Sequence, residues 1–399
     1  MTRAYAIAIS SHPTMQAATT NVSILTALLL GMGCGSSGGT SPGASGTASS
    51  AGATAGSTAS GTGSTTGMVS SGSATTGASS SGGAGGHPPS CAVLGPGRSD
   101  CGSTKESCCA SPMVTGGTYD RSYVFGDAGA GTDPATVTGF WLDKYDVTVG
   151  RFRPFVGAVL STDAGLGWRP LAGSGKHAHL SSGKGLLNVG PSDAGVAYET
   201  GWVASDDDKV SPTSANLACS PLGTWTASPT TQENLPINCV NWWEAYAFCI
   251  WDGGFLPSEA EWEYAAAGGN QQREYPWGST DPGSANRYAI YNCDYPVPGA
   301  ACMDLSSIAP VGTPAMGAGL WGQLDLAGEM WAWTADWYTA AYVDPCVDCA
   351  TLTGGSSRAI RGGSFRDDAT NLSSAFRNAN DPSIRNDFIG FRCARSHAP

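Results

Sequence analysis

Residues 235–269 read LPINCVNWWEAYAFCIWDGGFLPSEAEWEYAAAGG, and this stretch contains two helix-start signals in close succession. Asn241 and Ser258 are each followed three residues later by Glu, which is the capping-box pattern of a helix N-terminus. An apolar-faced run follows each of the two signals. We therefore expect one helix over about 242–250 and another over about 259–267.

The regions on either side of this stretch predict short strands among long loops. Thr138–Val147 alternates apolar and polar residues as a strand does, and Thr148 is placed to cap a helix over 149–160. Residues 161–234 show little periodicity and are expected to form loops. The segment 275–399 is rich in Trp and punctuated by Gly and Pro, which indicates short strands and ordered loops. Together these patterns predict an α+β fold held by tryptophans and disulfides.

The N-terminal part of the chain predicts export. Residues 1–33 have a basic residue, an apolar run too short to span a bilayer, and a small residue before Cys34, which is the outline of a secretory signal peptide. The Gly-Cys junction resembles the acylation site of bacterial lipoproteins, so we expect Cys34 to be lipidated. In the alternative, the signal is simply cleaved or the start codon is misassigned, and Cys34 is an incidental thiol. Residues 34–89 are almost entirely Gly, Ser, Thr and Ala and are expected to form a disordered linker.

The charge balance excludes some partners. Twenty Lys and Arg face 32 Asp and Glu, and the net charge of −12 argues against a nucleic acid or an anionic membrane face as partner. Contact with a membrane is therefore expected through the lipid anchor only. The expected location is the cell envelope or the extracellular space.

The cysteines indicate an oxidising compartment. The chain has 13, of which Cys34 stands apart and the other twelve lie beyond residue 90, too many for an ordinary reduced cytosolic enzyme. Residues 90–110 form a Cys-rich lead-in, in which the vicinal Cys108 and Cys109 cannot easily pair with one another and are each expected to bridge elsewhere. Local spacing also suggests the pairs Cys219–Cys239, Cys293–Cys302 and Cys346–Cys349.

Four stretches, taken in order, resemble the sulfatase-modifying factor family, which includes the formylglycine-generating enzymes. They lie within residues 114–155, 235–278, 309–338 and 361–394, the last beginning Arg-Gly-Gly-Ser-Phe and ending Gly-Phe-Arg-Cys-Ala. The resemblance covers residues 111–396 and implies an elaborated C-type-lectin-like fold with little regular secondary structure. It also implies a disulfide between Cys249 and Cys393.

The resemblance implies a chemistry whose key residues are missing here. Formylglycine-generating enzymes oxidise a substrate cysteine with oxygen and a copper(I) ion held by two thiolates, three and eight residues beyond the Ser of Arg-Gly-Gly-Ser. Counted from Ser364, these positions hold Asp367 and Leu372. Asp is a hard oxygen ligand, and Leu has no group that binds a metal. Copper is therefore not expected. A related iron-dependent branch carries a His-x-x-x-His-x-Glu motif, which this sequence lacks.

The family's calcium sites are also eroded. The candidate ligands are Asn286 and Asp304 at one site and Asp325, Gly328 and Glu329 at the other. Because calcium takes hard oxygen ligands, it is the cofactor for which these residues are suited. Two further metal hypotheses are weaker: the run 206–208 of three aspartates is more typical of a solvated turn, and His177 with His179 has no third ligand in view.

Three functions stay open at this point. The leading hypothesis is a non-oxidase member of the family that binds a peptide or glycan or has a structural role in the envelope. The alternative is a formylglycine-generating oxidase of altered mechanism that converts a sulfatase cysteine. The third is another oxidoreductase or hydrolase that uses Asp367, Asp368 and Arg377. The missing thiolate pair and the Trp-rich scaffold favour the first.

Overall fold

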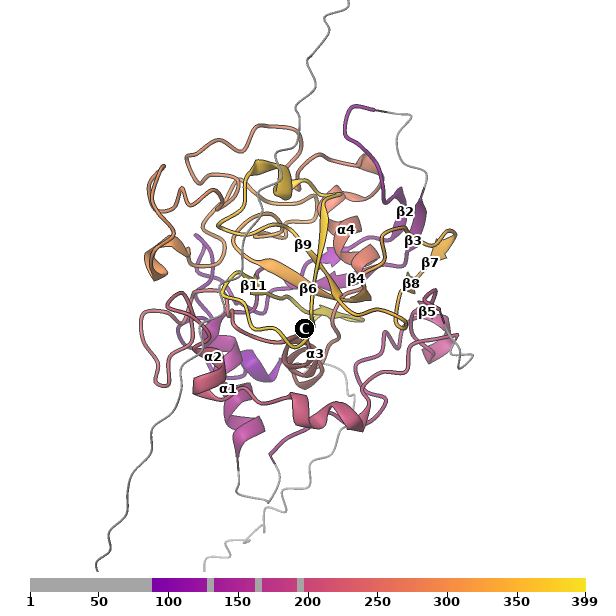
Figure 1. Ribbon diagram of the computed structural model, residues 1–399, viewed down its shortest axis with the longest axis horizontal. Helices are drawn as coiled ribbons and strands as arrows, with labels where there is room; N and C mark the ends of the chain where they lie inside the picture. The colour runs from indigo at the N-terminus through magenta and orange to yellow at the C-terminus, as the bar shows by residue number, and fades with distance from the viewer. Residues whose placement is uncertain (1–87, 128–132, 162–166, 192–196) are drawn as a thin grey trace, which may run out of the picture. The chain divides into compact units, whose positions relative to one another are not determined.

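The computed structural model describes residues 88–127, 133–161, 167–191 and 197–399 (Figure 1). The expected signal peptide, Cys34 and nearly all of the expected linker lie outside the described residues. The helices are α1 (Val149–Leu160), α2 (Ser214–Leu217), α3 (Trp242–Trp251) and α4 (Glu259–Ala267), with 3-10 segments η1 (Pro89–Cys91), η2 (Ser181–Gly183), η3 (Ala204–Lys209), η4 (Gly269–Gln271), η5 (Leu305–Ser307) and η6 (Ala369–Leu372).

The strands are short and form four small sheets. They are β1 (Met113–Val114), β2 (Gly117–Asp120), β3 (Pro134–Val137), β4 (Phe140–Leu142), β5 (Leu187–Asn188), β6 (Trp331–Trp337), β7 (Cys346–Val347), β8 (Cys349–Ala350), β9 (Arg358–Arg361), β10 (Arg377–Asn380), β11 (Ile389–Gly390) and β12 (Ala394–Arg395). The strand orders are β10-β9-β6-β11, β1-β4-β12, β2-β3-β7 and β5-β8. The expected α+β fold with little regular structure is confirmed.

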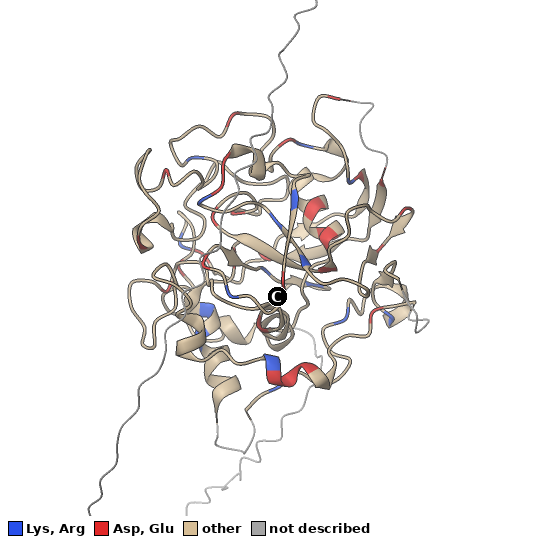
Figure 2. Ribbon diagram, in the orientation of Figure 1, with Lys and Arg blue, Asp and Glu red and all other residues tan. Residues whose placement is uncertain are grey.

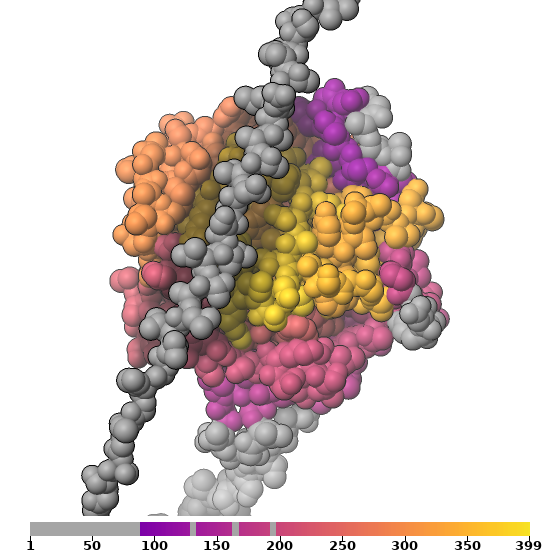
Figure 3. Space-filling view, viewed as in Figure 1, coloured from indigo at the N-terminus to yellow at the C-terminus, as the bar shows by residue number. Residues whose placement is uncertain are grey.

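The central sheet is built on the antiparallel pair β6 and β9. Ala332 faces Arg361 and Trp337 faces Arg358, with a register shift between these two ends of the ladder. Strand β11 pairs in parallel with β6, whereas β12 joins β4 in another sheet. Residues 389–395, which contain β11 and β12, are called the C-terminal segment here. This segment contacts β6 in the second half of the domain and β4 in the first half. On the face shown in Figure 3 this segment (yellow) lies between the segments around residues 280–310 (orange) and 340–350 (amber).

The helix predictions are confirmed with their capping residues. Both capping boxes are complete, because the side chains of Asn241 and Ser258 accept the N3 amide while the N3 glutamate accepts the N-cap amide. Thr148 caps α1 by accepting from the Arg151 amide. Helix α4 ends at Gly268, whose φ of 65° is the left-handed conformation that glycine adopts at helix C-termini.

The strand expected over Thr138–Val147 is wrong in extent, since β4 spans only Phe140–Leu142. The alternation that suggested a longer strand does not mark a solvent face, because Asp143 and Asp146 are fully or almost fully buried. Their carboxylates turn inward to arginines instead of lying on an exposed face of a sheet. Beyond Leu142 the backbone still bonds to neighbouring segments, since the Asp143 amide donates to the Cys393 carbonyl and the Lys144 amide to the Ala110 carbonyl.

Aromatic side chains fill the core between α1, α3 and the C-terminal segment. Phe152 stacks on Phe248 at 5.5 Å between ring centroids, and Phe248 meets Phe391 edge-on at 5.4 Å. Phe155 packs edge-on against Phe248 from the next turn of α1. Such ring pairs stabilise a core beyond the area that they bury. A second apolar cluster surrounds α4 and includes Trp262 and Leu326.

Disulfides connect these layers. The structure joins the four pairs expected from the sequence, which are Cys249–Cys393, Cys219–Cys239, Cys293–Cys302 and Cys346–Cys349. The vicinal lead-in cysteines bridge elsewhere, in Cys91–Cys109 and Cys101–Cys108. The bond between Cys249 on α3 and Cys393 next to β12 spans 144 residues of sequence. It fixes the C-terminal segment to the core.

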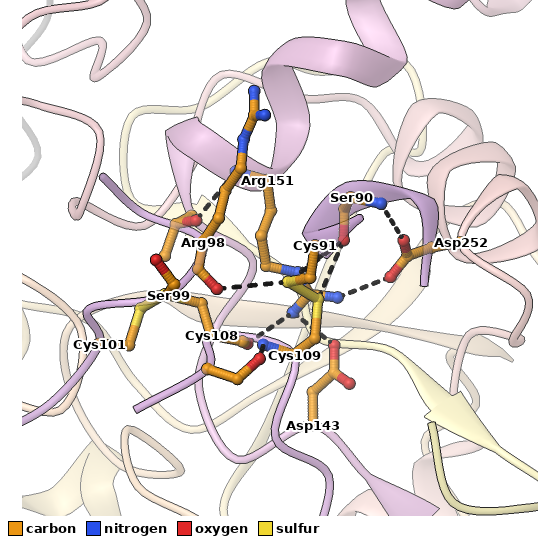
Figure 4. The surroundings of a disulfide bond; sticks show 12 residues. Ser90, Cys91, Arg98, Ser99, Cys101, Cys108, Cys109, Asp143, Arg151 and Asp252 are labelled. Carbon is orange, nitrogen blue, oxygen red and sulfur yellow. Dashed lines mark hydrogen bonds and ion pairs between the residues drawn. A yellow bond between two sulfur atoms is a disulfide. The ribbon is translucent and has the colours of Figure 1, made fainter. Parts of the chain in front are cut away.

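The Cys-rich lead-in is docked on a buried ion-pair network (Figure 4). The Ser90 amide donates to Asp252 at 3.0 Å, and Arg151 Nε donates to the Ser90 hydroxyl at 3.1 Å. Arg151 also pairs with Asp252 at 2.7 Å and Asp143 at 2.8 Å. Arg395 pairs with the same two carboxylates. The lead-in is therefore part of the domain that follows it.

No helix in the described part of the chain is long and apolar enough to cross a membrane.

Replacing Cys249 and Cys393 together by Ser should lower the free energy of unfolding by about 3–5 kcal/mol, because the bond closes a loop of 144 residues. Urea unfolding under non-reducing conditions measures the loss. The matched control replaces Cys346 and Cys349, whose loop spans 3 residues, and should cost much less. Equal losses in the two double variants would contradict the expectation.

Candidate functional site

The Arg-Gly-Gly-Ser segment leaves β9 and places Asp367 in a closed turn. Asp367 Oδ2 accepts from the Ser364 amide at 2.9 Å, from the Ser364 hydroxyl at 2.6 Å and from Trp331 Nε1 at 2.8 Å. One carboxylate oxygen thus holds three donors from the turn and from β6. These contacts give Asp367 a structural role that requires no metal.

Leu372, at the second family position, lies in a packed apolar cluster. It is the last residue of η6, its side chain is 0% exposed, and it packs with Tyr291 and Ala327. The half-buried rings of Tyr275 and Trp277 cover the same cluster and stack on each other at 4.9 Å. A buried Leu beside a half-buried Asp offers no soft ligand to copper(I).

Asp368 and Arg377, which a hydrolase or another oxidoreductase would use together with Asp367, contact different parts of the structure. Asp368 caps η6 by accepting from the Thr370 amide and hydroxyl, and these hydrogen bonds lower the pKa of its carboxyl group. Arg377 pairs with Glu259 on α4 at 2.5 Å. The structure therefore gives Asp368 and Arg377 local structural roles.

At the first calcium position, Asp304 and Asn286 have local hydrogen-bond partners. Asp304 is exposed and caps η5 by accepting from Ser306, whose amide is at 2.9 Å. The Asn286 side chain donates instead to the Asp294 carbonyl at 2.9 Å, and its Oδ1 is buried without a partner. The expectation that these two residues bind calcium therefore stays a prediction.

The second calcium position contains a cluster of buried carboxylates. Asp325 accepts from the Gly312 amide at 2.8 Å, and Glu329 Oε1 accepts from the Ala309 amide at 2.8 Å. Asp146 is the third member and pairs with Arg392 at 2.7 Å. Burial raises the pKa of Asp146 to about 6 and, together with the Asp146 charge, the pKa of Asp325 to about 7. Burial and the charge of Asp325 raise the pKa of Glu329 well above its usual value.

Two oxygens of this cluster, Asp146 Oδ2 and Glu329 Oε2, are buried without a partner. Hard oxygens of this kind suit a cation. Gly328 adopts a φ of 79°, and its carbonyl accepts from the Met330 amide, so this carbonyl already has a donor. Among the residues that the structure describes, no three His, Cys, Asp or Glu side chains are grouped to hold a metal. The cluster therefore offers hard oxygens of the type that calcium takes, without three carboxylates grouped around one point.

His177 is clamped between two glutamates that are distant in sequence. Its Nδ1 lies 3.0 Å from Glu199 and its Nε2 lies 3.0 Å from Glu261 on α4. Burial alone lowers the pKa of His177, but Glu261 and Glu199 outweigh it and raise this pKa to about 10. His179 packs on Phe255, and both of its ring nitrogens lack a partner. His177 therefore forms ion pairs that join two segments, and His179 is a packing residue.

The aspartate run at 206–208 has local partners as well. Lys209 donates to Asp206 at 2.7 Å, and Trp202 Nε1 donates to Asp207 at 2.8 Å. Figure 2 shows this run as the acidic turn of η3 with its basic end. Sequence spacing could not have identified either Trp202 or the glutamates that hold His177.

The paired helices, the Trp-rich β6 and the Arg-Gly-Gly-Ser turn together define a sulfatase-modifying factor domain. A model of the sulfatase-modifying factor enzyme 1-like domain matches residues 99–397, and the chain belongs to this family. The formylglycine-generating enzyme of Thermomonospora curvata is 32% identical over 272 residues, which cover 64% of this chain and 81% of that protein.

Two mouse relatives are named as an enzyme and as an inactive enzyme. The formylglycine-generating enzyme of Mus musculus is 35% identical over 174 residues, which cover 42% of this chain and 46% of the mouse protein. The inactive C-alpha-formylglycine-generating enzyme 2 of Mus musculus is 34% identical over 169 residues, covering 41% of this chain and 49% of that protein. The chain thus spans about half the length of these mouse relatives. Among solved structures, PvdO from Pseudomonas aeruginosa is similar with a TM-score of 0.47 and 20% identity, covering 76% of this chain and all of that one.

Replacing His177 by Gln should change how stability depends on pH. A group whose pKa rises on folding, here from 6.5 to about 10, stabilises the fold fully below pH 6.5 and loses that contribution as pH rises through 10. The variant should therefore be less stable than the wild type by a few kcal/mol at pH 6, and the gap should narrow towards pH 10.

Urea unfolding at pH 6, 8 and 10 measures this gap. His397→Gln, at an exposed position near the C-terminus, is the control and should follow the wild type at each pH. A gap of constant size from pH 6 to pH 10 would show that His177 acts through packing and not through its charge.

Proposed function

We propose that this protein is a non-oxidase member of the sulfatase-modifying factor family, exported and lipid-anchored, that binds a peptide or glycan ligand in the cell envelope. The observation that carries the proposal is the state of the two copper positions. Asp367 closes a turn with Ser364 and Trp331, and Leu372 is sealed in a core cluster.

The chemistry of copper supports the loss of oxidase activity. Copper(I) is a soft ion that requires soft ligands, and two thiolates are the defining pair in this family's oxidases. Every one of the twelve cysteines among the described residues is paired in a disulfide, so none offers a thiolate. The name of the mouse inactive enzyme 2 indicates that a relative of this chain lacks the activity as well.

Export and anchoring rest on different observations. Disulfides persist in oxidising compartments, so the bonds that join the lead-in, the core and the C-terminal segment favour a location outside the cytosol. Anchoring rests on Cys34 and its preceding small residue, and the segment 34–89 supplies the tether.

The decisive experiment exposes the purified protein to copper(I), oxygen and a Cys-x-Pro-x-Arg peptide and follows the peptide thiol by mass spectrometry. No oxidation of the peptide is expected. The Thermomonospora curvata relative serves as the positive control. Turnover by this chain would overturn the proposal in favour of a formylglycine-generating oxidase of altered mechanism.

We further propose calcium as the cation for the carboxylate cluster of Asp146, Asp325 and Glu329. Millimolar calcium at pH 8 should raise the thermal midpoint, because a cation bound only by the native state stabilises it. Asp325→Asn should abolish this rise. Asp304→Asn, at the exposed cap of η5, is the matched control and should retain it. An unchanged midpoint in the wild type, with and without chelator, would contradict the assignment.

A further inference from the structure

Arg358, the first residue of β9, differs from most of the other buried arginines, and among the described residues only the buried Arg121 shares its lack of an ion pair. Arg151, Arg361, Arg392 and Arg395 each have a carboxylate within ion-pair distance. Arg358 has none among the residues that the structure describes, although its side chain is only 7% exposed. A buried cation without an anion is costly, so its occurrence calls for a physical reason.

The guanidinium of Arg358 is held in a fixed position. Its central carbon lies 3.5 Å from the ring centroid of Trp242 and 3.7 Å from that of Trp337, so it is sandwiched between two indoles. One nitrogen donates to the Ala335 carbonyl at 2.6 Å, while Nε is buried without a partner. Burial lowers the pKa of Arg358 to about 9, which is the direction expected for a cation that lacks a counter-ion.

Arg358 lines a cavity of about 240 Å³. The two indoles of the sandwich, Trp202 and Tyr246 supply aromatic walls, and Glu199 and Asp206 supply carboxylates. The volume is smaller than the ~300–1,000 Å³ of sites for drug-sized ligands, which suits a single ring-sized group. The walls come from α3, β6, β9, residues 199–206 and Leu352, which precedes β9.

The two carboxylates of the cavity already have cations. Glu199 is paired with His177 at 3.0 Å, and Asp206 with Lys209 at 2.7 Å. Neither neutralises Arg358, but both retain the capacity to accept hydrogen bonds from hydroxyl groups. A ligand that completes the cavity must bring an anion for Arg358, hydroxyl donors for the carboxylates and an apolar face for the indoles.

We propose that this cavity binds a hexuronic acid residue of an acidic glycan, with the sugar carboxylate paired to Arg358. A hexuronic acid carries all three features on one ring: a carboxylate, several hydroxyl groups and a face of C–H bonds. A peptide carboxyl terminus brings the anion and lacks the hydroxyl groups. This inference rests on the proposed binding function and identifies its ligand class and site.

The test measures binding of three probes to the full chain by titration calorimetry: D-glucuronate, D-glucose and an acetylated dipeptide with a free carboxyl end. Glucuronate should bind at least tenfold more tightly than either of the other two. Equal binding of glucose, tighter binding of the dipeptide, or no binding of glucuronate would each overturn the proposal.

Arg358→Gln should weaken glucuronate binding at least tenfold. Arg121→Gln is the matched control, because Arg121 is also buried, lies 4.4 Å from the ring centroid of Tyr342 and donates to the carbonyls of Asp133 and Val343, away from this cavity. Binding should survive that change. Retained binding in a folded Arg358→Gln protein would overturn the proposal.

A second measurement does not depend on the folding of the arginine variants. Glucuronate should shift the indole N–H signal of Trp337 in the nuclear magnetic resonance spectrum of the wild type, with Trp337→Phe used for assignment, and glucose should not. An unshifted signal at saturating glucuronate would overturn the proposal. The peptide oxidation assay is independent of this cavity, so failure here with no oxidation there would reject the glycan site and leave the non-oxidase function standing.

Discussion

A fully buried helix that carries three carboxylates is the constraint on which much of the fold depends. All nine residues of α4 are buried, and these include Glu259, Glu261 and Glu263. A charge in such a place must find a partner, because an unpaired buried ion is far more costly than an exposed one. Figure 2 shows these acidic positions on α4. Arg361 pairs with Glu259 at 2.9 Å and with Glu263 at 2.6 Å, while His177 pairs with Glu261. With Arg377 of β10, which also pairs with Glu259, two strands and the loop around His177 are held to one helix.

The same network gives the Arg-Gly-Gly-Ser motif a structural role. Arg361 is an ion-pair partner of α4, and Gly362 and Gly363 have φ angles of 103° and 73° where added side chains would crowd Trp262 and the Asn371 carbonyl. Ser364 donates to Asp367 within the turn. Each part of the motif thus has a structural duty, so its presence marks the fold and not the activity.

The sequence predicted those features whose causes are local. Capping boxes and N-caps depend on residues three positions apart, and so the helices at 149–160, 242–251 and 259–267 could be located well. The resemblance to a family supplied the long-range Cys249–Cys393 pair. What could not be predicted depends on partners far along the chain. Glu199 holds His177, and Arg151 pairs with Asp143 just beyond the end of β4. The cap that Asp304 forms on η5 was not predicted, because an N-cap and a metal ligand use the same residue type. The cavity at Arg358 escaped notice for a related reason, since its walls come from separate segments.

The docking of the lead-in has a mechanical consequence. Any pull on the chain before Pro88 reaches the domain at η1, where Ser90 is bonded to Asp252 and Cys91 is cross-linked to Cys109. The Cys91–Cys109 bond carries such a load past residues 92–108 to Cys109, whose neighbour Cys108 accepts a hydrogen bond from Arg151 through its carbonyl. Load therefore enters where hydrogen bonds, ion pairs and disulfides act together, instead of unzipping a sheet edge one pair at a time. The lead-in thus joins the chain after Pro88 to the domain through covalent bonds, hydrogen bonds and ion pairs at one place.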